Sequence, residues 1–185
     1  MTTTATSTPP GIASALRRLY LVRFGFALVW AGALFATASG LGPVSAALLV
    51  LYPLFDVAAA VVDARSSRAS GPAAGLHANI AISSLAGVGL AVAVTSGVPA
   101  VLRVWGVWAI VSGLVQLVVG ISRRTLGGQW AMIASGGLSA VAGTTFYLQA
   151  STGGASLSTL AGYALVGGIF FLVSALRLGR ATTRN

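Results

Sequence analysis

The chain has 185 residues, of which 56% are hydrophobic and only 7% are charged, and its mean hydropathy is +0.92. A soluble domain carries about 25% charged residues, because polar groups must cover its outside. The composition therefore predicts a protein surrounded by lipid, and it disfavours a soluble enzyme, a nucleic-acid-binding protein and a secreted disulfide scaffold.

Six apolar stretches are long enough to cross a bilayer, which takes roughly 20 residues of helix. We expect transmembrane helices over residues 19–38, 43–62, 77–96, 98–121, 130–150 and 157–178. These runs are continuous rather than alternating, which disfavours the strands of a barrel. The predicted fold is therefore an all-α integral membrane protein with a six-helix domain over residues 17–180. Residues 1–16 are predicted to be a disordered cytoplasmic tail and residues 181–185 a second tail.

The first 39 residues also allow a second interpretation. A basic pair at Arg17 and Arg18, an apolar run and the triplet at residues 36–38 are together compatible with a signal peptide. The positive region begins unusually late for such a signal, which favours a retained first span.

The net charge is +9, and all 11 basic residues are arginine. With six spans, every arginine except Arg103 falls on the face that carries both chain ends. The positive-inside rule then places both termini in the cytoplasm of a bacterial cell, with the spans in the inner membrane. The bilayer is the expected partner, with anionic lipid headgroups at the cytoplasmic arginines and no nucleic acid.

A weak internal repeat accompanies this pattern. Residues 23–40 align with residues 80–97, and the fourth and sixth spans align with their arginines in register. Three helical hairpins in parallel orientation are therefore predicted, which differs from the inverted repeats of many transporters.

Small residues recur one turn apart within several spans, as in Ser83, Gly87 and Ala91 and in Ser135, Ser139 and Gly143. Such stripes mark close helix contacts in lipid; packing within the chain is favoured, with a homo-oligomer face as the alternative. Aromatic residues near the span ends are interpreted as belts at the membrane surface, whereas Trp30 and Tyr52 are expected inside the bundle. The expected belt residues are Trp105, Trp108, Tyr147 and Tyr163 on the outer side and Tyr20 and Trp130 on the inner side.

The only acidic residues are Asp56 and Asp63, which share a helix face with Tyr52. Asp63 is expected at the cytoplasmic water line. Asp56 lies about 10 Å deeper, where an unpaired carboxylate is costly, and Arg23 of the first span reaches the same depth. We therefore predict an ion pair between Arg23 and Asp56, interpreted as a clamp between helices or as part of an ion or proton pathway.

Three further polar residues are secondary candidates. Arg103, near the outer end of the fourth span, is expected to extend to lipid headgroups. Gln116, in mid-span, is expected to hydrogen-bond to another helix. His77 is expected at the cytoplasmic border, where it would be solvated or would sense pH.

The inventory of reactive residues is poor. The chain has no cysteine and one histidine, which disfavours thiolate chemistry, a metal centre and a catalytic triad. We therefore expect no catalytic activity, no metal and no other cofactor.

The span pattern and three stretches, residues 20–30, 51–56 and 127–130, resemble the HdeD family of short six-span bacterial inner-membrane proteins. The resemblance covers about residues 18–180 and implies a role in acid or envelope stress. It brings no established functional residues. The alternative is a small channel or transporter whose pathway is lined by Arg23 and Asp56.

Overall fold

The structure is a computed structural model and describes residues 10–66, 74–126 and 129–182. It contains six long helices, each apolar enough to cross a membrane. Their bounds are α1 Pro10–Thr37, α2 Pro43–Ser66, α3 Ala74–Ala93, α4 Val98–Ser122, α5 Trp130–Gln149 and α6 Leu157–Thr182. Two short 3-10 helices, η2 (Val94–Ser96) and η3 (Arg124–Leu126), follow α3 and α4. The prediction of an all-α, six-span protein is confirmed, and the described part of the chain has no strand.

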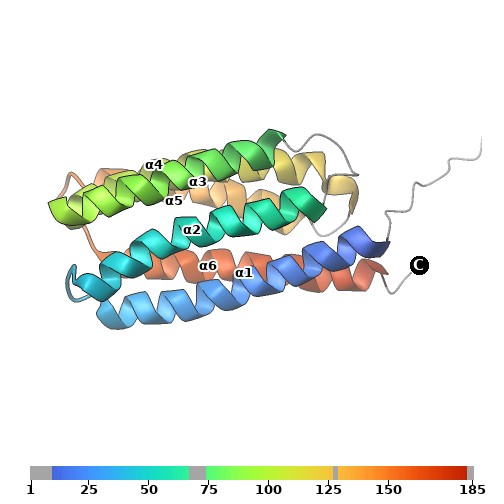
Figure 1. Cartoon of the computed structure of the whole chain (residues 1–185), viewed down its shortest axis with the longest axis horizontal. Helices are drawn as coiled ribbons and strands as arrows, with labels where there is room; N and C mark the ends of the chain where they lie inside the picture. Colours follow the sequence, from blue (N-terminus) through green and yellow to red (C-terminus); the bar gives the residue numbers. More distant parts are fainter. Residues whose placement is uncertain (1–9, 67–73, 127–128, 183–185) are drawn as a thin grey trace, which may run out of the picture.

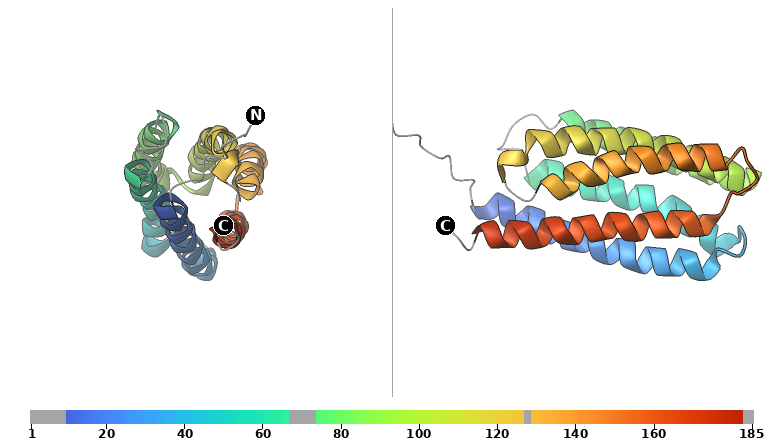
Figure 2. Two further views of the ribbon diagram at one scale, coloured as in Figure 1. Left: turned by 90° about the vertical axis from the view of Figure 1, so that its right-hand side faces the viewer. Right: turned by 180° about the vertical axis from the view of Figure 1, so that it is seen from behind.

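The six helices form a closed ring in chain order. Each helix contacts the next one in the chain, and α6 contacts α1. Figure 1 shows that α1 begins where α6 finishes, and the end-on view of Figure 2 shows the helices arranged around a centre. We call this end of the bundle the termini end and the opposite end the far end.

The predicted tails are shorter than expected. The described residues begin at Pro10, and α1 is helical from there on. Residues 10–16 are therefore helical rather than part of a tail. Helix α6 likewise continues to Thr182. The rest of the predicted tails, residues 1–9 and 183–185, lies outside the described residues.

The closest packing joins helices of different hairpins. The most extensive contacts are between α4 and α5, followed by α1 with α6 and α2 with α3. The three hairpins thus follow one another along the chain, while the ring is held mainly by contacts between them.

Glycines allow the very close approach of α4 and α5. A Cβ atom added at Gly113 would lie 2.7 Å from the carbonyl oxygen of Gly136, and one added at Gly143 would lie 2.5 Å from that of Gly106. The sequence interpretation of small-residue stripes as contacts within the chain therefore applies to Ser135, Ser139 and Gly143, all of which are buried. Ala91, in the predicted stripe on α3, is exposed instead.

Some of the aromatic residues predicted to form membrane belts lie inside the bundle instead. Trp105 and Trp108 are buried, with exposures of 0% and 6%, and they pack with Trp30 and Tyr52 in one group that we call the aromatic cluster. Ring centroids within the cluster are 4.6 Å apart for Trp30 and Tyr52 and 5.1 Å apart for Trp105 and Trp108. The expectation that Trp30 and Tyr52 lie inside the bundle is confirmed.

Of the other four predicted belt residues, two pack inside the bundle and two are exposed. Tyr20 is buried, and Tyr163 is partly buried and donates a hydrogen bond to Ser139. Trp130 and Tyr147 are exposed, in agreement with the prediction. Four of the six side chains assigned to belts therefore pack inside the ring, because the face of a helix that turns inward depends on its neighbours.

Candidate functional site

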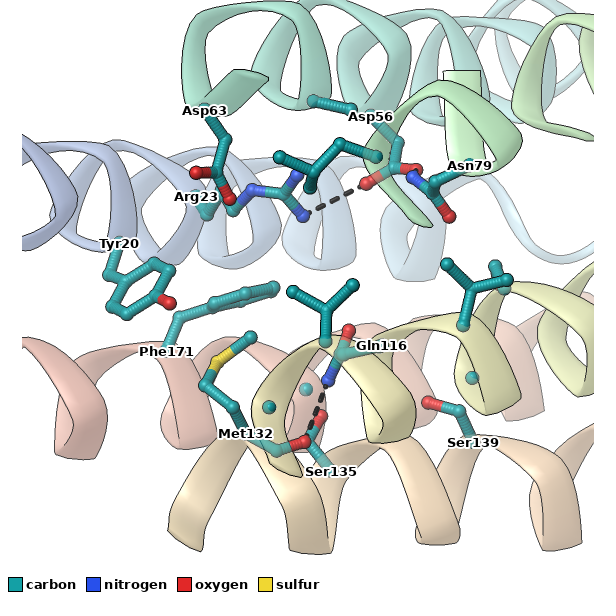
Figure 3. Close-up of a pocket in the computed structure, with 18 of the residues that line it drawn as sticks. Tyr20, Arg23, Asp56, Asp63, Asn79, Gln116, Met132, Ser135, Ser139 and Phe171 are labelled. Atoms are coloured by element: carbon teal, nitrogen blue, oxygen red, sulfur yellow. Dashed lines mark hydrogen bonds and ion pairs between the residues drawn. The ribbon is translucent and has the colours of Figure 1, made fainter. Parts of the chain in front are cut away.

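The predicted pair between Arg23 and Asp56 forms. Nη1 of Arg23 on α1 lies 2.9 Å from Oδ1 of Asp56 on α2, and each side chain is 14% exposed. Figure 3 shows the guanidinium and the carboxylate facing each other across the two helices. Asp56 lies ten residues from the end of α2 at Ser66, which is about 15 Å along the helix. The two charges therefore neutralise each other well inside the bundle.

Helix α3 supplies the second half of the Asp56 environment. Oδ2 of Asp56 accepts hydrogen bonds from the side-chain amide of Asn79 at 2.7 Å and from the hydroxyl of Ser83 at 2.8 Å. Ser83 in turn accepts a hydrogen bond from the indole N–H of Trp108 on α4 at 3.0 Å. One carboxylate therefore joins α1, α2 and α3 directly and α4 through Ser83. We call these five residues, Arg23, Asp56, Asn79, Ser83 and Trp108, the Asp56 centre.

The second acid, Asp63, is buried, although a position at the water line led us to expect a solvated carboxylate. Its side chain is 9% exposed, and its carboxylate lies 2.9 Å from Nη1 of Arg123, which follows α4. The prediction was wrong because it considered only the distance of Asp63 from the end of its own helix. In the ring, the side chain of Arg123 reaches the carboxylate of Asp63 on α2, and both acidic side chains are paired with arginine.

A cavity of about 100 Å³ lies beside both ion pairs. All six helices contribute to its lining, which extends from Arg123 and Gln129 near the termini end to Tyr52, Trp108 and Tyr163 deeper in the bundle. In Figure 3, Arg23 and Asp56 form one wall and Gln116, Met132 and Ser139 lie opposite them. A volume of this size can hold a few water molecules next to polar groups.

The far half of the ring is filled. The aromatic cluster continues into a hydrophobic core that includes Leu34, Leu49, Leu90 and Leu102, each of which is completely buried or nearly so. The cavity therefore occupies the half of the bundle toward the termini end, and packed side chains separate it from the far end.

The secondary candidates occupy different surroundings. Gln116 donates a hydrogen bond to the carbonyl of Met132 on α5 at 3.1 Å, as expected for a bond between helices. Tyr52 packs in the aromatic cluster and lines the cavity. His77 is exposed near the start of α3, and Arg103 is exposed near the start of α4. The structure thus brings Arg23, Tyr52, Asp56, Asp63 and Gln116 to one cavity and leaves His77 and Arg103 outside its lining.

Several residues of this site were not singled out from the sequence. Asn79 and Ser83 lie four residues apart and so share one face of α3. That spacing is a usable signal, although Ser83 was interpreted only as a packing residue. Arg123 was assigned to the solvated cytoplasmic face, and nothing in the sequence places it beside Asp63.

Among the described residues, no group of three or more histidine, cysteine or acidic side chains is close enough together to hold a metal ion. No protein-family model, curated protein or solved structure matches the chain.

Proposed function

We propose that this chain is a non-catalytic, multi-pass protein of the bacterial inner membrane, similar to the HdeD family, that acts in acid or envelope stress. The observation that carries the proposal is the Asp56 centre, in which one carboxylate accepts hydrogen bonds from three side chains on two other helices. The arrival of a single proton at Asp56 would therefore alter contacts with two other helices at once.

Protonation would act on the Asp56 centre in two ways. The neutral carboxylic acid no longer compensates the charge of Arg23, and one of its oxygens becomes a donor facing the amide of Asn79 or the hydroxyl of Ser83. The other charged or titratable groups of the cavity around Asp56 are Tyr20 on α1, Tyr52 and Asp63 on α2, Arg123 after α4 and Tyr163 on α6. Asp63, the other acid of the cavity lining, is itself paired with Arg123.

The distribution of arginine supports the orientation of the protein in the membrane. Arg17, Arg18, Arg65, Arg124, Arg177 and Arg180 are exposed at the termini end. Loops and helix ends with excess arginine remain in the cytoplasm, so the termini end is assigned to that side. The cavity beside Asp56 then faces the cytoplasm, and the proposed stimulus is acidification of the cell interior.

A second candidate function is transport. It is favoured by one observation: Arg23 and Asp56 line the cavity, as expected of charged residues on a substrate or proton pathway. In a transporter the packed far half would have to open in turn. An Asp56→Asn variant that abolishes a flux while the amount of folded protein is unchanged would favour this second candidate.

Survival under acid tests the stress proposal. We expect that cells lacking the protein survive an acid challenge less well, that the wild-type chain restores survival, and that Asp56→Asn does not restore it at equal protein levels. The control is His77→Ala, which removes the exposed titratable group of α3 and is expected to restore survival fully. Full rescue by Asp56→Asn, or loss of rescue with His77→Ala alone, would contradict the proposal.

A further inference from the structure

A second concavity lies on the outside of the ring, and Trp108 lines both it and the Asp56 cavity. It has a volume of about 480 Å³ and is lined by α3, α4 and one residue of α5. Its lining residues are Ile82, Leu85, Ala86, Arg103, Val104, Val107, Trp108, Val111 and Tyr147. We call it the outer groove. Its volume falls in the range of roughly 300–1,000 Å³ that small-molecule sites occupy.

The groove is apolar along its length and charged at one end. Along α4 its lining runs from Val111 to Arg103, which is about 12 Å of helix. Half of the hydrocarbon core is about 15 Å thick. The groove therefore matches in length the acyl chain of a lipid in one leaflet, namely the leaflet at the far end.

The position of Arg103 places its charge at the headgroup level. Its Nη2 atom donates a hydrogen bond to the carbonyl of Ala150 at 3.4 Å, and Ala150 directly follows the last residue of α5 at the far end. The exposed ring of Tyr147, near the end of α5, lines the same part of the groove. Arginine and tyrosine at this depth are residues that interact with lipid headgroups.

Neither acidic side chain of the chain is paired with Arg103 in the part that the structure describes. The chain has two acidic residues in all, and each is paired with another arginine in the opposite half of the bundle, Asp56 with Arg23 and Asp63 with Arg123. The anion that neutralises Arg103 must therefore come from outside the chain. At this depth in a bilayer, the available anion is a lipid phosphate.

We propose that the outer groove is a binding site for one anionic phospholipid, with its phosphate on Arg103 and one acyl chain between α3 and α4. The lipid belongs to the leaflet at the far end, which is the outer leaflet under the proposed orientation. The site adjoins the Asp56 cavity at Trp108, but the proposal does not depend on the proposed stress function.

Native mass spectrometry of the full chain in detergent, titrated with phosphatidylglycerol, tests this site. We expect Arg103→Gln to weaken binding of the first lipid by about fivefold, the contribution of roughly 1 kcal/mol from one arginine near a lipid surface. The matched control is Arg124→Gln, because Arg124 is also exposed and also donates to a carbonyl at 3.4 Å, but at the termini end. We expect this control to leave the first binding constant unchanged.

A second pair of variants tests the groove rather than the charge. Val107→Trp fills the groove and is expected to weaken binding at least as much as Arg103→Gln. Its control, Val118→Trp, adds the same bulk at an exposed position of α4 outside the groove. Equal loss with Arg103→Gln and Arg124→Gln, unchanged binding by Val107→Trp, or equally tight binding of chain-free glycerol phosphate would each overturn the proposal.

Discussion

Replacing Arg23 with leucine is expected to lower the free energy of unfolding by about 2 to 3 kcal/mol. Removing one partner of a buried ion pair costs about 3 to 5 kcal/mol, because it leaves the other charge uncompensated. We expect a smaller loss than this range for Arg23→Leu because each side chain is 14% exposed. In addition, Asn79 and Ser83 still donate hydrogen bonds to Asp56 in the variant. Reversible unfolding in mixed micelles, followed by circular dichroism, measures the loss.

A double-mutant cycle separates the ion pair from the packing of the two side chains. We expect the combination of Arg23→Leu with Asp56→Leu to cost less than the two single changes together, with a coupling energy of about 1 to 2 kcal/mol. Arg18→Leu, an exposed position of the same helix, is expected to have little effect. Additive costs would show that Arg23 and Asp56 do not support each other.

The contact between α4 and α5 is expected to be sensitive to a single methyl group. Gly143→Ala would place a Cβ atom 2.5 Å from the carbonyl oxygen of Gly106 and 2.9 Å from the backbone nitrogen of Ile110, so the two helices must separate. Overpacking of this kind costs about 1 to 3 kcal/mol, which the same unfolding measurement detects.

Gly137, six residues earlier on α5, provides the matched control. A Cβ atom added there meets nothing within 4 Å. Alanine is favoured over glycine inside a helix by about 1 kcal/mol, so Gly137→Ala is expected to leave stability unchanged or to raise it slightly. If both variants lose stability equally, the glycines act through the helix backbone rather than through contact between α4 and α5.

The correct predictions depend on properties that can be read along one helix, namely the length of an apolar run and the depth of a residue within it. The spans are determined by the length of apolar runs against bilayer thickness. The Arg23 and Asp56 contact followed from depth, since a buried acid needs a cation and Arg23 reaches the same level of the adjacent span. Gln116 was expected to bond across helices because an amide in lipid has few other partners.

The errors arose where the answer depends on how helices are arranged around the ring. Asp63 was placed in water because its distance from the helix end does not reveal that Arg123 covers it. Trp105 and Trp108 were placed at the membrane surface because a tryptophan near a span end suits both a belt and a core. In the structure, α4 turns this face inward, and both indoles pack against Trp30 and Tyr52 in the core. No periodicity within one helix contains that information.

The dependence of stability on pH tests the central claim, that Asp56 is the proton-sensitive contact of the ring. Thermal unfolding in detergent is measured across a range of pH for the wild type and for Asp56→Asn. The difference between the two curves removes the contribution of Asp63, which both proteins retain.

The ion pair with Arg23 stabilises the fold only while the carboxylate of Asp56 is ionised. We therefore predict that the wild type is more stable than Asp56→Asn near neutral pH and that the difference shrinks on acidification. Two curves that coincide, or that stay parallel at every pH, would contradict the account.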